Sequence, residues 1–299
     1  MKMKSARKAY VFAILAVLFW STSPTAFKLG LRFTDTWQLL TGATLVSTVV
    51  LGLLSLRGGK FRALRSFTRP ELAFSVLMGL LNPVVYYLIL FKAYSILPAQ
   101  VAQPLNMIWP IVLVLLAVPI LHQRLSWISL GAMLLSFSGV VIVSLMGGHG
   151  SEDSQNRQGI FLALSTSVIW ALYFLYNTRD NKDPVLRLFL NFAFASVFLL
   201  VAGIFRSKPF PPSMEGWYAS LYIGVFEMGI TFVLWLMAIR LAPSSDRISN
   251  LVYIAPFLNL LFASQILGEK IYITTVFGIF LLVSGIVIQN INGKNAKQL

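Results

Sequence analysis

The sequence predicts an all-α polytopic membrane protein, and three observations lead to that fold class. Hydrophobic residues make up 57% of the 299 residues and charged residues only 11%. The mean hydropathy is +0.78. Long apolar segments also follow one another with short polar links, which leave no room for a separate soluble domain. Because soluble domains carry about 25% charged residues, a soluble fold could not cover its surface with so few charges.

Ten apolar segments are long enough to cross a membrane, which takes about 20 residues of helix. The first five run over Tyr10–Leu29, Trp37–Leu56, Glu71–Phe91, Leu97–Pro119 and Ser126–Met146. The second five run over Gly159–Tyr176, Pro184–Phe205, Trp217–Ile239, Ser249–Leu267 and Ile273–Ile291. The first segment follows basic residues, as in a signal peptide, but it exceeds the roughly 7–15 apolar residues of one. We therefore expect an uncleaved helix.

The basic residues predict the orientation of the chain. The net charge is +14, from 24 Lys and Arg against 10 Asp and Glu. With the N-terminus placed in the cytoplasm, 17 of the 24 bases fall on the cytoplasmic side, five of them between Arg57 and Arg69. Because basic residues favour that side, we expect both termini in the cytoplasm. The basic excess is then an orientation signal, and we expect no nucleic-acid partner.

The two sets of five segments resemble each other. The residues that align at an offset of 146 or 150 positions are Pro110 with Pro256, Ser138-Gly139 with Ser284-Gly285, and Trp20 with Trp170. Because five is odd, the two halves would cross the membrane in opposite directions. The sequence thus predicts ten transmembrane helices as a five-plus-five inverted-topology repeat, with residues 1–149 and 150–299 as the repeats. Inverted repeats are typical of secondary transporters, which bind substrate near the midplane.

Three stretches carry a resemblance to a known family. They are LPAQVAQPLNMIWPI at Leu97–Ile111, GVFEMGITFVLWLMA at Gly224–Ala238 and ILGEKI at Ile266–Ile271. With the predicted repeat, they resemble EamA-type exporters of the drug/metabolite transporter superfamily over nearly the whole chain. The first half departs from the family's usual Gly-Glu-Lys or Gly-Glu-Arg ending and has His122-Gln123-Arg124. The resemblance implies export of amino acids or related small metabolites across a bacterial cytoplasmic membrane, with no catalytic residue.

Glu227 is predicted to lie near the centre of a membrane-spanning segment. It stands about ten residues from either end of Trp217–Ile239, roughly 15 Å from each surface at 1.5 Å per residue. Thr231 follows one helical turn later and shares its face. Ionisable residues at this depth mark substrate or ion pathways by default. We expect Glu227 to bind substrate and carry proton coupling; the alternative is a neutral Glu hydrogen-bonded between helices.

Other polar and aromatic residues are predicted to line a midplane cavity. Gln103 and Asn106 lie with Gln100 on one stripe of their helix, and their amides cannot all face lipid unsatisfied. The remaining candidates for substrate binding are Asn82, Trp20, Trp170, Asn250 and Tyr253. The alternative is hydrogen bonding between helices for the polar residues and packing for the Trp residues.

Pro110 and Pro256 are predicted to interrupt two membrane helices. Each proline removes a backbone hydrogen bond and frees a carbonyl. The resulting kinks would serve as gates during transport, or they would be static bends.

Several kinds of site lack the residues they need. The chain has no Cys, which excludes disulfides and Cys-ligated metals. The two His residues, His122 and His149, fall in predicted loops. No P-loop, zinc-protease or nucleophile-elbow motif is present. We expect no metal, no cofactor and no enzymatic activity.

The expected partners are a small-molecule substrate, the lipid bilayer and protons as coupling ion, with the chain a monomer or a homodimer. Two alternatives remain on the same residues. A nucleotide-sugar or phosphate-ester transporter of this fold would need Lys or Arg deep in the membrane, and none is predicted there. A lipid-handling or structural membrane component would leave Glu227 and the amides without an aqueous cavity.

Overall fold

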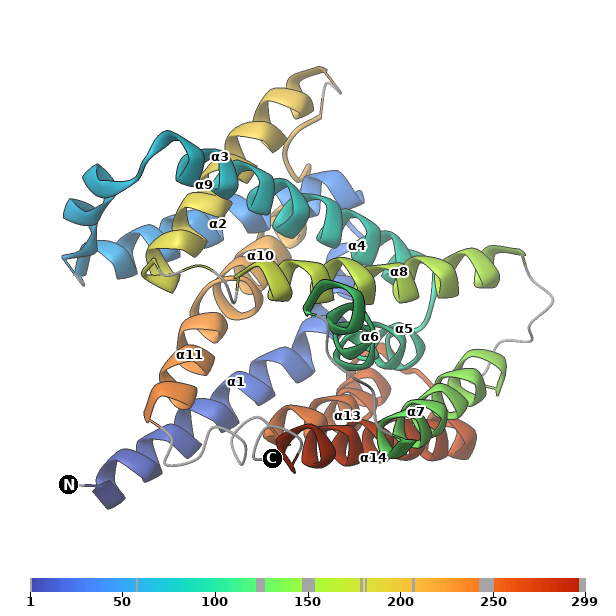
Figure 1. Ribbon diagram of the computed structural model, residues 1–299. Coiled ribbons are helices and arrows are strands. Elements are labelled where there is room, and N and C mark those ends of the chain that lie inside the picture. Colours follow the sequence, from blue (N-terminus) through green and yellow to red (C-terminus); the bar gives the residue numbers. More distant parts are fainter. Residues whose placement is uncertain are drawn as a thin grey trace. The chain divides into compact units, whose positions relative to one another are not determined.

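The computed structural model describes residues 2–57, 59–121, 127–146, 154–177, 180, 182–205, 208–241 and 250–295. Within these ranges every regular element is helical and no strand is present (Figure 1). Each of the ten predicted apolar segments is mostly helical where it is described, and the exceptions include a turn at residues 107–108 and another at 228–229. His122 and His149 lie outside the described residues, as does Gln123-Arg124.

The elements of the first half of the chain are α1 (Lys2–Gly30), α2 (Thr36–Arg57), η1 (Lys60–Ser66), α3 (Arg69–Gly79), η2 (Leu80–Val85), α4 (Tyr86–Ile96), α5 (Ala99–Asn106), α6 (Trp109–Leu121) and α7 (Trp127–Met146). Those of the second half are α8 (Ser154–Asn177), α9 (Pro184–Phe205), α10 (Met214–Tyr222), η3 (Ile223–Glu227), α11 (Ile230–Leu241), η4 (Asn250–Ile254), α13 (Ala255–Leu267) and α14 (Ile273–Asn295). Two of these, η1 and η4, are 3₁₀ helices, whereas η2 and η3 are π-helical turns.

Membrane-spanning length is reached by six stretches among the described residues. They are Arg7–Gly30, Thr36–Arg57, Arg69–Ile96, Asn156–Asn177, Pro184–Phe205 and Met214–Ala238. Shorter apolar helices cover Leu130–Val143, Leu251–Leu267 and Ile273–Ile288. The protein is therefore a polytopic helical membrane protein, and the total of ten spanning helices remains a prediction.

The helix geometry changes beside both prolines for which the sequence predicts kinks. Helix α5 ends at Asn106 and α6 begins at Trp109, because Pro110 has no N–H group to donate to the Asn106 carbonyl. Pro256 occupies the second position of α13, directly after the 3₁₀ helix η4. Motion of these interruptions as gates remains a prediction.

The chain forms two compact units, and each unit uses both halves of the sequence. Unit 1 comprises Met1–Phe91 and Arg179–Ala255, and unit 2 comprises Lys92–Thr178 and Pro256–Leu299. The compact units therefore differ from the predicted repeats 1–149 and 150–299, which remain a prediction about the sequence.

Small residues bring the helices of unit 1 close together. In this unit α2 packs against α9 and α10, α3 against α9, and α1 against α11. A Cβ atom on Gly79 would lie 2.3 Å from the carbonyl oxygen of Asn191, so α3 approaches α9 at backbone distance. The hydroxyls of Thr48 and Ser196 lie 2.9 Å apart and join α2 to α9. This pattern is typical of helix packing in membranes, where small residues allow close contact.

The main pairing of unit 2 is between α7 and α14, which lie side by side in Figure 1. A Cβ atom on Gly139 would meet the Gly278 carbonyl oxygen at 2.4 Å and the Leu282 amide nitrogen at 2.6 Å. The Ser136 hydroxyl donates to the Leu282 carbonyl at 2.9 Å. Small residues therefore let α7 and α14 approach each other with backbone against backbone.

One end of unit 1 carries a buried arginine with a full set of partners. The guanidinium of Arg187 is 3% exposed and forms an ion pair with Asp180. It also donates to the Glu71 carbonyl at 2.7 Å and to the Ser75 hydroxyl at 2.6 Å. The ring of Phe67 lies 5.0 Å from the guanidinium. Because an unpaired buried charge is strongly destabilising, these contacts explain how α9 can begin with a buried base.

Two further ion pairs close the same end of unit 1. Lys60 of η1 lies 2.9 Å from Asp183, and Lys182 lies 3.0 Å from Glu71. Asp183 also accepts hydrogen bonds from the amides of Val185 and Leu186 in the first turn of α9. Partial burial opposes ionisation of Asp183, but the hydrogen bonds from Lys60 and these amides lower its pKa below the ordinary value. The pairs fasten the α2–α3 connection to the start of α9.

Replacing Gly139 with Ala is expected to loosen α7 from α14, because the new methyl group would meet backbone atoms that cannot move aside. We expect a loss of about 1–3 kcal/mol in the free energy of unfolding, measured by thermal unfolding in detergent. Gly131→Ala on the same helix is the matched control, since nothing lies within 4 Å of its Cβ position. Equal melting temperatures for the two variants would contradict this packing.

Replacing Asp183 with Asn is expected to lower the melting temperature at neutral pH and to flatten its acid dependence. The folded-state pKa of Asp183 lies below its unfolded value, which is about 3.9. Its stabilisation is therefore complete above that value and is lost as the pH falls through the lowered folded-state pKa. Melting temperatures measured between pH 7 and about 3 should converge for the two proteins at the acid end. Parallel curves would contradict the assignment.

Candidate functional site

The third membrane-spanning stretch is broken at Asn82. Pro83 has no N–H group to donate to the Gly79 carbonyl, and η2 takes up a π-helical turn there. Asn82 leaves the helical conformation, with φ −146° and ψ 115°. Its side chain is 1% exposed, and neither its amide oxygen nor its amide nitrogen has a hydrogen-bond partner among the described residues. Buried amide groups are normally hydrogen-bonded, so an amide without a partner is a candidate for binding a ligand or a water molecule.

A second π-helical turn, η3, ends at Glu227. The Met228 amide donates to the Ile223 carbonyl at 3.0 Å, one residue further than in an α-helix. The hydroxyl of Thr231, which is fully buried, donates to the Phe226 carbonyl. The Thr231 hydroxyl therefore replaces a backbone donor at the break, and its proton is already used in this hydrogen bond. Such π-turns recur at functional sites.

The carboxyl group of Glu227 is held by a tyrosine. The Tyr87 hydroxyl, from α4, donates to Oε1 of Glu227 at 2.9 Å. The Ser23 hydroxyl of α1, which donates to the Phe19 carbonyl, lies beside the same carboxyl. The second oxygen, Oε2, has no hydrogen-bond partner among the described residues. One oxygen is thus fixed and the other is open to a donor.

Aromatic rings pack against Phe226 and Tyr87, the chain neighbour and the hydrogen-bond partner of this acid, within unit 1. Phe226, its neighbour in η3, lies 4.8 Å from Phe19 and 5.0 Å from Tyr222 between ring centroids. Tyr87 contacts Phe27 and Phe91 at 6.4 and 5.5 Å. The residues beside the carboxyl are thus part of an aromatic cluster, and aromatic rings, like carboxylates, attract organic ammonium groups.

Trp20 lies on the same helix as Phe19 and Ser23 but contacts α11. Its ring lies 5.3 Å from Trp235 and 6.0 Å from Phe232. The ring is half-buried. Trp20 therefore belongs to the α1–α11 contact, where packing and substrate contact both remain open.

The two predicted residues of η4 lie in unit 1 as well. Asn250 begins η4, and its side chain lies outside the described part of the chain. Tyr253 is half-buried. Their participation in substrate binding remains a prediction.

The other predicted site residues belong to unit 2. Asn106 donates to the Thr166 hydroxyl at 2.8 Å, which joins α5 to α8. Gln103 is 4% exposed, and its side-chain oxygen has no partner in the described ranges. Trp170 lies 5.8 Å from Tyr173, one turn away on α8. The structure thus assigns the predicted residues to two separate groups, one in each unit, and a single cavity that unites them remains a prediction.

Glu269 of the Gly-Glu-Lys motif has a positioning role that the sequence left undefined. Its carboxylate accepts hydrogen bonds from the backbone amides of Ala99 at 2.8 Å and Gln100 at 3.2 Å. The Gln100 side chain donates in return to the Lys270 carbonyl at 2.7 Å. Asn259 donates to the Ala99 carbonyl at 3.3 Å. Together these bonds tie the start of α5, which carries Gln103, to the α13–α14 connection.

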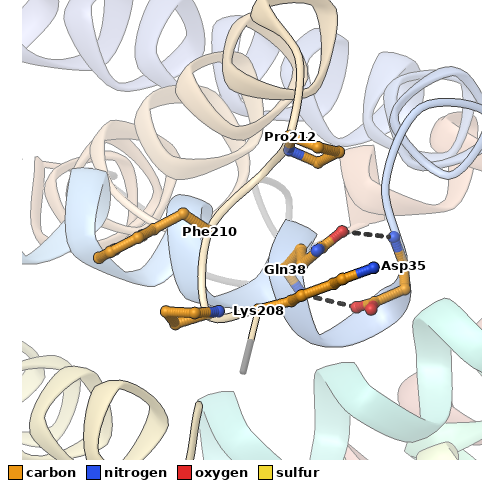
Figure 2. A pocket seen from close by; sticks show the side chains of 6 residues that line it. Asp35, Gln38, Lys208, Phe210 and Pro212 are labelled. Atoms are coloured by element: carbon orange, nitrogen blue, oxygen red, sulfur yellow. Dashed lines mark hydrogen bonds between the residues drawn. The ribbon is translucent and has the colours of Figure 1, made fainter. Parts of the chain in front are cut away.

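A surface pocket of about 450 Å³ opens elsewhere in unit 1 (Figure 2). It is lined by Asp35, Gln38, Lys208, Pro209, Phe210 and Pro212. Figure 2 shows the two hydrogen bonds that Asp35 and Gln38 exchange, at 2.8 and 3.2 Å, across the first turn of α2. The two hydrogen bonds cap the start of α2, so the side-chain oxygens that form them already have a partner. No residue predicted to bind substrate lines this pocket.

The helical fold, the broken membrane segments and the enclosed acid define a polytopic membrane protein of the transporter class. The model of the EamA-like transporter family matches residues 7–145 and again residues 157–291. The chain belongs to this family, which confirms the resemblance seen in the sequence motifs.

Curated relatives carry transporter and exporter names. An uncharacterized transporter of Clostridium kluyveri is 25% identical over 303 residues, 98% of this chain and 96% of the relative. A probable terminal-alkyne amino-acid exporter of Streptantibioticus cattleyicolor is 24% identical and covers 88% of this chain and 86% of its own length. The aromatic amino acid exporter YddG of Ancylobacter novellus is 25% identical over 59% of this chain and 61% of its own length.

A solved crystal structure shares the fold. It matches 97% of this chain and 99% of its own, with a TM-score of 0.68 at 19% sequence identity. At this identity the likeness concerns the fold alone.

Replacing Glu269 with Gln is expected to expose the first amides of α5. A glutamine side chain has one acceptor oxygen in place of two, so one amide loses a charge-assisted bond worth about 1.5–3 kcal/mol. Hydrogen–deuterium exchange in the peptide around Ala99–Gln103 should accelerate by about tenfold or more. Lys270→Gln is the control, because only its backbone carbonyl takes part. Unchanged exchange in Glu269→Gln would rule out the positioning role.

Proposed function

We propose that this protein is a secondary transporter that exports small metabolites, namely amino acids or their analogues, across a bacterial cytoplasmic membrane. The observation that carries the proposal is the Glu227 carboxyl, which is held at one oxygen by Tyr87, has no hydrogen-bond partner at the other among the described residues, and stands next to Phe226 of an aromatic cluster. A carboxylate beside π faces suits the ammonium group and the apolar side chain of an amino acid. The names of two relatives as amino-acid exporters support this substrate class.

Alternating access between two inverted repeats is the mechanism we propose. Three observations support it. The family model matches the chain twice, in residues 7–145 and 157–291. The third and eighth predicted segments each contain a π-helical turn, η2 and η3. The fourth is interrupted just before Pro110, and the ninth changes from 3₁₀ helix to α-helix beside Pro256. Corresponding breaks in two halves are typical of transporters that exchange roles between repeats.

Proton coupling through Glu227 is the second part of the proposal. Glu227 stands at a break in a membrane-spanning helix. Its neighbours Tyr87 and Ser23 carry hydroxyl groups and no basic group. With no fixed counter-ion among these contacts, the carboxyl can exchange a proton for the ammonium group of a substrate. Each exchange would link export to the proton gradient, since acids inside membranes form proton relays.

The orientation follows from the charge count. The basic connection Arg57–Arg69 would lie in the cytoplasm with both termini. Glu269 and the pocket of Figure 2 would then lie toward the other side of the membrane.

Transport in proteoliposomes tests the proposal, with labelled phenylalanine and a panel of other amino acids under an imposed pH gradient. We expect Glu227→Gln to lower flux by about 10- to 100-fold, as expected for loss of a charge-assisted bond, and to abolish the dependence on the gradient. Glu215→Gln, at an exposed acid in the first turn of α10, should leave both unchanged.

Two outcomes would count against different parts of the proposal. If Glu227→Gln kept full gradient-driven flux, proton coupling through this acid would be wrong. If the unaltered protein moved no amino acid of the panel, the substrate class would be wrong.

A further inference from the structure

The connection between α2 and α3 presents a basic surface where two membrane-spanning stretches end. Helix α2 ends at Arg57 and α3 begins at Arg69, with η1 between them. No residue of η1 is buried. Arg57, Arg62, Arg65 and Arg69 are all exposed. We name these four residues the arginine cluster.

The remaining residues of this connection fasten it to unit 1. Phe61 packs on Phe189 of α9 with ring centroids 5.2 Å apart. Lys60 pairs with Asp183. Phe67 lies beneath the ammonium group of Lys182 at 4.9 Å. The apolar side chains and Lys60 thus hold η1 in place, and the four arginines are left to face outward.

The neighbouring acids are already in use. Glu71 pairs with Lys182, Asp180 with Arg187, and Asp183 with Lys60. Among the described residues, no ion pair or hydrogen bond engages a side chain of the arginine cluster. Four positive charges at one end of the unit therefore lack counter-charges among the described residues, and this surface attracts anions from outside the protein.

The surroundings of the cluster indicate which anion this is. Leu53 and Leu56, in the last turns of α2, are exposed aliphatic side chains directly before Arg57. In a spanning helix such side chains face lipid tails. A ligand that combines an anionic phosphate with acyl chains can contact both the arginines and these leucines at once. Guanidinium groups match phosphate oxygens with two parallel hydrogen bonds.

We propose that the arginine cluster binds the headgroups of anionic phospholipids, and that these lipids join the end of α2 to the start of α3. Basic clusters next to a membrane helix attract anionic lipids by about 1 kcal/mol per base. The bound lipid neutralises the cluster and reinforces the ion pairs that hold η1. The inference concerns lipid binding only and does not depend on which solute the protein carries.

Binding of phosphatidylglycerol to the purified full-length protein in detergent tests the proposal, with lipid retention measured by native mass spectrometry. Arg62→Gln with Arg65→Gln should weaken phosphatidylglycerol binding by about 30-fold, which corresponds to about 1 kcal/mol for each base. Phosphatidylcholine should bind both proteins weakly and equally. Lys92→Gln with Lys208→Gln removes the same charge at two other exposed bases and should retain wild-type binding.

Two further arms distinguish a bound phospholipid from a free phosphate ion and from attraction by net charge alone. Arg62→Lys with Arg65→Lys keeps the charge but loses the paired hydrogen bonds, so an intermediate affinity is expected. Inorganic phosphate at the same concentration as the lipid should not displace it, because it lacks the acyl chains. Full competition by phosphate, or equal losses in the Arg62/Arg65 and Lys92/Lys208 variants, would overturn the proposal.

Discussion

A peptide group inside a membrane must find its hydrogen-bond partner within the protein, and this constraint determines where the chain can place polar atoms. Continuous helix satisfies it without side chains. Where the helix breaks, at η2 and η3, carbonyl groups need other partners and the backbone can turn polar side chains inward. Asn82 and Glu227 stand at those two breaks. The hydroxyl of Thr231 takes up a carbonyl that the second break releases. The candidate site is thus a local consequence of interrupted helices.

The two oxygens of the Glu227 carboxyl, at the second break, differ in their hydrogen-bond partners, and this difference determines what the carboxyl can bind. Tyr87 holds one carboxyl oxygen, while the other has no hydrogen-bond partner in the described part of the chain. In surroundings of low polarity, an unfilled acceptor attracts a donor more strongly than it would in water. The oxygen held by Tyr87 orients the carboxyl group, and the oxygen without a partner can accept a hydrogen bond from a ligand. The same carboxyl can therefore hold either a proton or an ammonium group, which is the exchange that the proposed proton-coupled export requires.

The sequence predicted the helical membrane fold and the family, because apolar length and scarce charge are local properties. Glu227 and Asn82 were predicted as site residues for the same reason, as polar residues inside apolar segments, and their part in substrate binding stays a prediction. Tyr87 was missed, because a tyrosine in an apolar helix is unremarkable until its partner 140 residues away is known. Thr231 was placed on the Glu227 face by counting in a regular helix, whereas the π-turn shifts that count. The motif around Glu269 was recognised, but its amide partners are 169 and 170 residues away.

The composition of the compact units has a consequence for biosynthesis. Helix α2 packs against α9, which starts only at Pro184, roughly 130 residues after α2 ends at Arg57. At about 5–20 residues per second, a ribosome needs roughly 6–25 s to make the missing partner. During that interval the face of α2 that contacts α9 has no partner from the second half of the chain, and the Thr48 hydroxyl relies on its bond to the Thr44 carbonyl within α2. The lasting contacts of α2 thus form only after α9 has been made.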